Sequence, residues 1–382
     1  MASSLSTTLQ RSGSGALPLS PAPRLSRRTS GQLCHSPLSR ACSCPAVQDE
    51  LGLPSASKSN AVDPFTAAGR RLQTLLSRVG DGEDELLNSL VEQESPESKL
   101  QTSVILGGCV TIGAVVVASL LGQDPWGGLG PSSATLGAAG VGLAAALPMA
   151  AIRMWSWTPA AAQAIPALQD VHDGQLELHR PWLASMDRGQ VFTLMALEVL
   201  PLTMLLFPAG QAGIMAAVTM YGQLINGSGL EAQSHDTYLT ALALVLTALV
   251  SAMGRSMELS VSEEEYELVQ TAARNADRYY RTMAADLHTS PVEASRAAEA
   301  FRFVAQAWLQ TKGEASLLAG VITALDVLAL GALWHGTGNL AAPALAALAI
   351  NAVDYWHLHS AVLRKEAKVA RHTGSSSGSG GN

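Results

Sequence analysis

Long apolar runs constrain this chain more than any other feature of its sequence. Each run approaches or exceeds the roughly 20 residues that an α-helix needs to cross a bilayer. They lie at residues 102–122, 133–152, 191–222, 237–253, 315–334 and 338–360. The sequence therefore predicts an all-α fold, a multi-pass bundle of transmembrane helices with about six net crossings.

The composition excludes several classes of protein. Only 14% of the 382 residues are charged and the formal net charge is −7, whereas ordinary soluble domains carry about 25% charged residues. The mean hydropathy is +0.20, which does not fit a soluble enzyme or a disordered protein. A nucleic-acid binder would need a basic excess. We therefore expect membrane lipid around the chain and no nucleic acid.

The first 48 residues differ from the rest of the chain. They contain five arginines and eleven serines, with no lysine, no acidic residue and no long apolar segment. This composition is typical of a transit peptide and not of a secretory signal, and the Met-Ala-Ser-Ser opening favours the chloroplast. Residues 1–48 are therefore predicted to direct the protein to the thylakoid membrane or the inner envelope.

One apolar run, at residues 191–222, is too long for a single straight crossing. Pro201 and Pro208 lie inside it. Proline removes a helical hydrogen bond and clashes with the preceding turn, so it kinks or ends a helix. The run is therefore predicted to form two short spans or one broken, re-entrant element.

The basic residues favour the second alternative. Lys and Arg near the ends of spans stay on the side from which insertion starts. If residues 191–222 make one net crossing, the loops on one face contain all of these residues. The loops on the other face, at 123–132, 223–236 and 335–337, contain none. We therefore expect six crossings, with both ends of the mature chain in the stroma.

Three polar segments flank the predicted spans at 101–254 and 314–362. Residues 49–100 contain apolar side chains at helical spacing, which predicts an amphipathic helix that contacts anionic lipid or packs on the membrane domain. Residues 255–313 begin with the capping-box pattern of Ser262 and Glu265 and are predicted to form a stromal helical hairpin that partners bind. The tail at 363–382 is Gly/Ser-rich towards its end and is predicted to be disordered.

Polar side chains inside the predicted spans are the candidate site residues. Glu198 precedes the prolines, Asp326 lies in the middle of a span, and Asn351 lies in the last span. Because polar groups in hydrocarbon are costly, these residues either pair within the bundle or hold a ligand or a proton. Asp354 and His357 have the spacing of metal ligands on a helix, but further ligands are missing. The sequence thus predicts no metal and no cofactor.

The last apolar run opens with a local pattern that resembles a known family. Thr337 and Gly338 are followed by Pro343, and Asn351 stands eight residues after that proline. The pattern is similar to the last conserved helix of the CPBP family, the CAAX proteases and bacteriocin-processing enzymes. The resemblance covers roughly fifteen residues by motif and residues 190–360 by architecture.

The resemblance implies an intramembrane hydrolase, but the residues that would carry out the reaction are absent. The family uses Glu-Glu-x-x-x-Arg and two histidines to activate water. Glu198 has neither the neighbouring glutamate nor the arginine, and Ala347 stands where a histidine would precede Asn351. Without a general base and imidazoles, nothing activates the water. The resemblance therefore implies a catalytically degenerate member.

Degenerate plastid relatives, the thylakoid proteins named for balance of chlorophyll metabolism, resemble scaffolds that act on tetrapyrrole-synthesis enzymes. The chain is accordingly interpreted as a non-catalytic scaffold that binds and regulates or stabilises stromal or thylakoid proteins. Two alternatives stay open. One is an intramembrane metalloprotease of the CAAX-protease type, and the other is a small-solute transporter built around residues 191–222.

Overall fold

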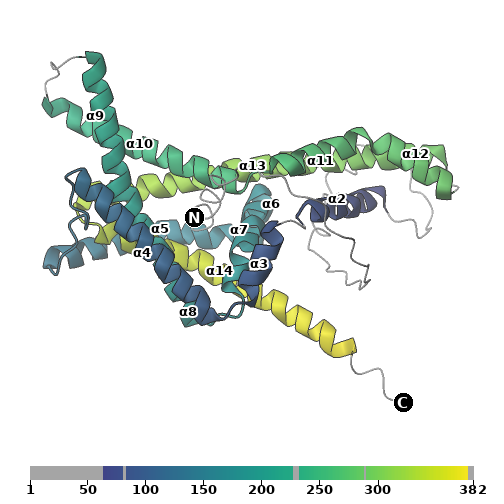
Figure 1. The fold of residues 1–382 in the computed structure, drawn as a ribbon, viewed down its shortest axis with the longest axis horizontal. Coiled ribbons are helices and arrows are strands. Elements are labelled where there is room, and N and C mark those ends of the chain that lie inside the picture. The colour runs from purple at the N-terminus through teal and green to yellow at the C-terminus, as the bar shows by residue number, and fades with distance from the viewer. Residues whose placement is uncertain (1–62, 81–82, 227–231, 288–289, 377–382) are drawn as a thin grey trace, which may run out of the picture. The chain divides into compact units, whose positions relative to one another are not determined.

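The protein is all-α in a computed structural model, which describes residues 63–80, 83–226, 232–287 and 290–376. Every regular element in these ranges is helical (Figure 1). The chain divides into two compact units. Of the described residues, the bundle unit includes 86–226, 232–260 and 312–376, and the accessory unit includes 63–80, 83–85, 261–287 and 290–311. The predicted transit peptide, 1–48, lies outside the described residues.

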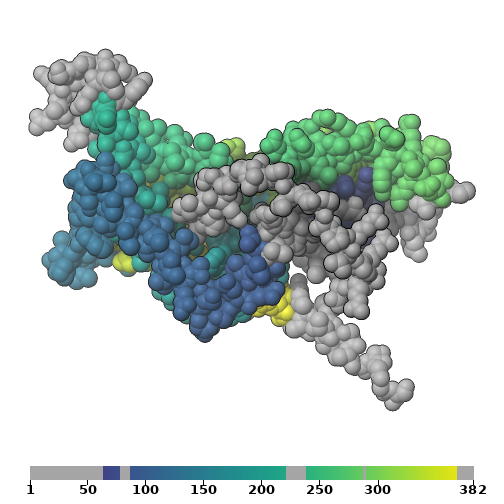
Figure 2. Space-filling view, viewed as in Figure 1, coloured from purple at the N-terminus to yellow at the C-terminus, as the bar shows by residue number. Residues whose placement is uncertain are grey.

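Five helical elements of the described chain are long and apolar enough to cross a membrane. They are α4 (Pro96–Leu120), α5 (Ser133–Ser156), Arg188–Met220, α10 (Ala232–Glu258) and α13 (Pro291–Thr337). Their outward side chains are uncovered, with Ile112 65% and Leu136 76% exposed. In Figure 2, side chains of the blue segment that includes α4 lie at the surface in this view. Lipid can solvate such apolar surface, so the chain is a multi-pass membrane protein, as predicted.

The run that was predicted to be two spans or one broken element is a continuous helical element. α8 (Arg188–Met204) leads into the π-helix η2 (Leu205–Gln211), and η2 leads into α9 (Ala212–Asn226). Pro201 and Pro208 lie before and inside the π-helical turns, where the regular α-helical bonding is interrupted. Because α4 packs along α8, η2 and α9, the run follows one path. The alternative of two short spans is therefore wrong.

The last predicted span, 338–360, is helical from residue 341, where α14 (Ala341–Ser376) begins. This helix is more polar than the five elements above, and it packs against α5, α7 (Ala167–Leu183) and α8. Its Asp354 and His359 are buried, so protein surrounds these polar groups and they need no contact with lipid. The count of six crossings depends on α14 and stays a prediction.

The predicted disordered tail, 363–382, is wrong for residues 363–376, which continue α14. Ala, Lys, Arg and Glu dominate residues 361–371, and these residues favour a helix. The Gly/Ser-rich stretch starts only at Gly374. Residues 377–382 lie outside the described residues.

Two helices between the second and third spans were not among the predicted elements. They are α6 (Pro159–Ala164) and the amphipathic α7 (Ala167–Leu183). Lys99 of α4 is fully buried, and its Nζ donates to the carbonyls of Pro181 at 2.7 Å and Ala184 at 3.1 Å. A cation at the carboxyl end of a helix satisfies its last carbonyls and its dipole. Lys99 therefore fixes α7 to the bundle.

The accessory unit combines segments that the sequence analysis treated as separate. It contains α2 (Pro64–Gly80), α11 (Glu263–Arg274), α12 (Ala276–Leu287) and α13 as far as Thr311. The predicted amphipathic helix in 49–100 is α2, and it packs on α11. It therefore has a protein partner inside the accessory unit, which neither predicted alternative named.

The described residues of the predicted insert at 255–313 are mostly helical, and its first helix differs from the prediction. The capping box of Ser262 and Glu265 begins α11 as predicted, but Asn275 ends α11 and a second short helix follows. The first helix of the predicted hairpin is therefore two short helices, α11 and α12. The division between the two units falls at Thr311 and Lys312, close to the predicted 313/314, and α13 runs through this point as one helix of 47 residues. Ala, Glu and Leu around this point favour a continuous helix.

Candidate functional site

A cavity of about 60 Å³ lies in the bundle unit beside Glu198. Its mostly apolar walls come from α4, α7, α8 and α14, and Ser103, His179, Glu198 and Tyr355 supply polar groups. One water needs about 10–15 Å³, so this cavity has room for a few waters. Pockets for drug-sized ligands measure about 300–1,000 Å³. The cavity is therefore too small to enclose a peptide substrate.

Glu198 has side chains from two other helices around it. The hydroxyl of Tyr355 on α14 donates to the Glu198 carboxylate. The ring of His179 on α7 packs edge-on to Tyr355, with 5.5 Å between the ring centroids, and its Nδ1 donates to the carbonyl of Gln175 at 2.9 Å. Burial lowers the pKa of His179, which keeps the imidazole neutral. The arrangement can hold a proton or a water at Glu198.

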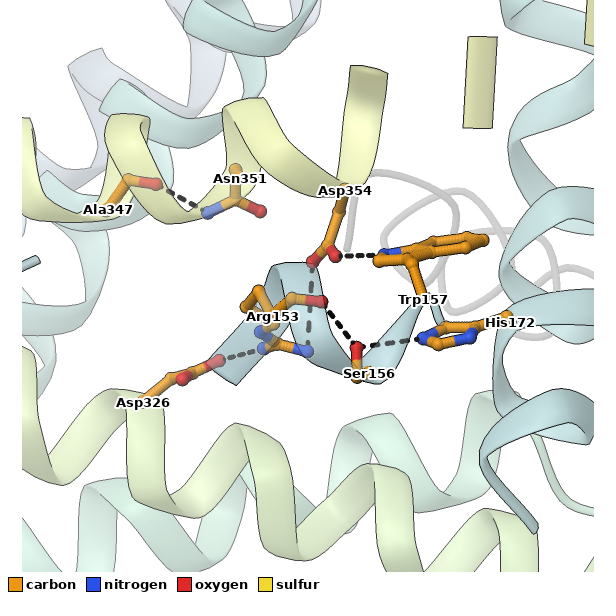
Figure 3. Close-up of polar contacts among 8 residues, drawn as sticks. All are labelled: Arg153, Ser156, Trp157, His172, Asp326, Ala347, Asn351 and Asp354. Carbon is orange, nitrogen blue, oxygen red and sulfur yellow. Dashed lines mark hydrogen bonds and ion pairs between the residues drawn. The ribbon is translucent and has the colours of Figure 1, made fainter. Parts of the chain in front are cut away.

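The second predicted site residue, Asp326 of α13, pairs with Arg153 of α5. Arg153 also lies 3.7 Å from the carboxylate of Asp354 on α14, and Figure 3 shows its guanidinium between the two carboxylates. The side chains of Arg153, Asp326 and Asp354 are 15%, 26% and 12% exposed. One cation thus joins three helices. Asp326 was predicted as a site residue and Arg153 was not, because 173 positions separate the two residues.

Aromatic rings extend this network. The Nε1 of Trp157 donates to Asp354 at 2.9 Å. The Trp157 ring stacks on His172 at 3.8 Å and on His357 at 5.1 Å between centroids. Asp354 and His357, considered above as metal ligands, therefore both interact with Trp157. Within the described residues, no three His, Cys, Asp or Glu side chains are placed to hold a metal ion.

His172 on α7 makes the stability of the fold depend on pH. Burial lowers the pKa of His172 to about 4 from its ordinary 6.5, so the unfolded chain binds a proton that the folded chain does not bind between these values. Above pH 6.5 the titration of His172 takes nothing from the free energy of unfolding. As the pH falls from 6.5 to 4, protonation of His172 in the unfolded chain lowers that free energy by at most about 3 kcal/mol. Phenylalanine at position 172 keeps the stack on Trp157 but does not titrate. We expect the melting temperature of H172F in detergent to fall less than that of the wild type over this range.

The comparison of these two variants isolates the His172 contribution from other titrations on α7. Burial raises the pKa of Asp170 and of Asp173, so these carboxyls bind protons more readily in the folded chain and act in the opposite direction. Both groups are present in each protein. Parallel melting curves of the wild type and H172F between pH 4 and 6.5 would contradict the prediction.

The third predicted site residue, Asn351, does not join the network. Its Nδ2 donates to the carbonyl of Ala347 on its own helix at 2.8 Å (Figure 3). Pro343, one of the residues that carry the family resemblance, is fully buried near the start of α14, where proline is tolerated. The structure therefore keeps Glu198, Asp326 and Asn351 in three separate environments.

The remaining residues of that local pattern build the turn between α13 and α14. The Thr337 hydroxyl donates to the carbonyl of Leu333 at 2.8 Å, and Gly338 has a φ of +61°, which favours glycine. Asn339 Nδ2 donates to the carbonyl of Gly128 at 2.7 Å, joining the turn to the loop before α5. Thr337 and Gly338 thus have a structural role here.

A further polar pair was missed by the sequence analysis. Gln211, at the end of η2, is 1% exposed, and its Oε1 lies 2.7 Å from Nε2 of His335 on α13. The sequence did offer a signal for this pair, because Gln211 stands three residues after Pro208 inside an apolar run. Helix interruptions with π-helical turns often lie at functional sites.

Comparisons with known proteins add no assignment. No family model, no curated protein and no solved structure matches this chain.

Proposed function

We propose that the chain is a non-catalytic membrane scaffold whose accessory unit binds and regulates or stabilises other proteins. One observation carries the proposal. Val292 and Phe303 are 62% and 60% exposed on the part of α13 that belongs to the accessory unit. Eleven residues are about three helical turns, so the two side chains lie on one face of the helix. Aromatic residues, phenylalanine among them, are enriched at protein–protein interfaces, so Phe303 is the proposed anchor of a partner-binding surface.

The bundle unit supports this choice. Its candidate residues interact with one another, since Tyr355 binds Glu198 and Arg153 neutralises Asp326. The cavity at Glu198 holds about 60 Å³, which fits waters and no peptide. These groups therefore have roles in holding helices together, and the accessory unit offers the surface for a partner.

The compartment and the partners are part of the same proposal. The composition of residues 1–48 supports a chloroplast membrane, the thylakoid membrane or the inner envelope, with the accessory unit in the stroma. The CPBP resemblance at Thr337, Gly338, Pro343 and Asn351 suggests a degenerate family member. Tetrapyrrole-synthesis enzymes are the partner class that this resemblance implies.

The rival function is intramembrane proteolysis, and one observation favours it. Glu198 lies at a cavity with His179 and Tyr355 nearby, and a carboxylate with a neutral imidazole can act as an acid and base pair. If this rival is correct, purified protein cleaves prenylated or leader peptides and E198Q abolishes the cleavage.

Affinity purification from plastid membranes tests the scaffold. We expect the double variant V292S/F303S to recover at least tenfold less of the proteins that co-purify with the wild type. Phe192, 59% exposed on α8 of the bundle unit, provides the matched control F192S, which should keep them. Equal recovery with V292S/F303S and the wild type would contradict the proposal.

A further inference from the structure

The cavity beside Glu198 has polar groups from four side chains in its lining. They belong to Ser103, His179, Tyr355 and Glu198 itself. A hydroxyl and a neutral imidazole carry one polar hydrogen each, and an ionised carboxylate carries none. The ligand that such a cavity takes therefore depends on where the hydrogens of Ser103, His179 and Tyr355 already donate.

Each of these three hydrogens already has an acceptor inside the bundle unit. Ser103 Oγ and His179 Nδ1 each donate to the carbonyl four residues earlier on their own helix, both at 2.9 Å. The Tyr355 hydroxyl donates to the Glu198 carboxylate. Lone pairs remain on Ser103 Oγ, on His179 Nε2 and on the oxygens of the Tyr355 and Glu198 pair. The polar lining of the cavity therefore accepts hydrogen bonds and has none left to donate.

The charge and the size of the cavity favour a small cation that carries N–H groups. The Tyr355 hydroxyl is neutral, so its hydrogen bond leaves the negative charge of an ionised Glu198 in place. A cation that donates to a carboxylate makes a charge-assisted hydrogen bond, which is stronger than a neutral one. The volume of about 60 Å³ has room for a few waters. An ammonium group is similar in size to a water, so it fits.

The apolar walls distinguish an alkylammonium from a metal ion. Leu106 of α4 and Leu197 and Leu202 of α8 line the cavity and are only partly buried, so the cavity is not sealed. Hydrocarbon walls supply no ligand to a metal ion, but they bury an alkyl group favourably. The cavity therefore suits a ligand with an ammonium head and a short apolar end.

We propose that this cavity is a binding site for a small primary ammonium cation, either the ammonium ion or a short alkylammonium such as methylammonium. Its N–H groups donate to the Glu198 carboxylate, to Ser103 Oγ and to His179 Nε2, and its alkyl group contacts the leucine walls. The site belongs to the bundle unit and does not depend on the surface at Val292 and Phe303. Failure of either proposal therefore leaves the other intact.

Equilibrium dialysis of the purified full-length protein in detergent against radiolabelled methylammonium chloride tests the site. We expect saturable binding of about one methylammonium per chain, because the cavity has room for little more. E198Q keeps the shape of the side chain and an oxygen for Tyr355 but removes the charge, so it should bind at least about tenfold more weakly. Glu177 is exposed on α7 and does not line the cavity. E177Q is therefore the matched control and should bind as the wild type does.

Competing ions and a second variant make the result specific. Ammonium chloride should displace the labelled methylammonium, whereas tetramethylammonium, which has the charge but no N–H group, should not. S103A removes one acceptor, keeps Glu198 and should weaken binding by a smaller factor than E198Q does. Circular dichroism checks that the variants stay folded.

Four results would overturn the inference. Absence of saturable binding to the wild type would mean that water alone fills the cavity. Displacement by Na⁺ or K⁺ as effective as that by ammonium would indicate a metal-ion site. Equal displacement by tetramethylammonium would show that N–H groups are not recognised, and E198Q that binds as tightly as the wild type would place the ligand elsewhere.

Discussion

Replacing Arg153 by methionine is expected to lower the free energy of unfolding of the protein by about 3–5 kcal/mol. The substitution keeps an unbranched side chain of similar length but removes the only charge that lies between Asp326 and Asp354 in this network. Two largely buried carboxylates would then face each other without a cation, which costs far more than the pair itself contributes. Denaturant unfolding in detergent micelles, followed by tryptophan fluorescence, measures the loss.

The triple variant R153M/D326N/D354N is the control for this prediction. It removes the charges together, so the uncompensated carboxylates disappear, and most of the lost stability should return. A fully destabilised triple variant would show that the shape of Arg153 matters and its charge does not. R153M with wild-type stability would mean that the network is not buried in the membrane-embedded protein.

Replacing Gly142 by alanine is expected to cost about 1–3 kcal/mol of stability through overpacking, or to prevent folding. Gly142 lies on α5 where that helix packs along α14, and a Cβ there would overlap the carbonyl of Ala342. Backbone cannot move aside as a flexible side chain can, so the two helices would have to separate. Thermal unfolding in detergent measures the effect.

Gly140 provides a matched control on the same helix. It is exposed, and a Cβ at this position meets nothing within 4 Å. G140A should therefore be neutral or slightly stabilising, because alanine is the better helix former. Equal effects of the two substitutions would show that the close contact of α5 and α14 is not present in the protein.

Sequence patterns predicted the structure correctly where the residues of a single segment determine its conformation. The long apolar runs became helices, the Ser262 and Glu265 pattern began α11, and the prolines of 191–222 coincided with a helix interruption. The prediction failed in the tail, where residues 363–373 contain no helix-breaking residue. α7 was missed because its apolar residues alternate with charged ones in a segment too polar to span.

The candidate site shows the same division. Glu198 and Asp326 were found because an ionisable residue in an apolar run is conspicuous on its own. Their partners Tyr355 and Arg153 lie 157 and 173 positions away, and nothing in the local sequence links them. Asn351 was found by its motif, yet its amide binds its own helix.

The sequence by itself determined that this chain is helical and resides in a membrane, because helix length and apolarity are local properties that the bilayer requires. Only the tertiary structure decided which polar groups neutralise one another and that α2 belongs with α11 to α13. Pairing of this kind depends on distances between residues far apart in the chain. Those distances are set by how helices pack, as Gly142 against Ala342 shows.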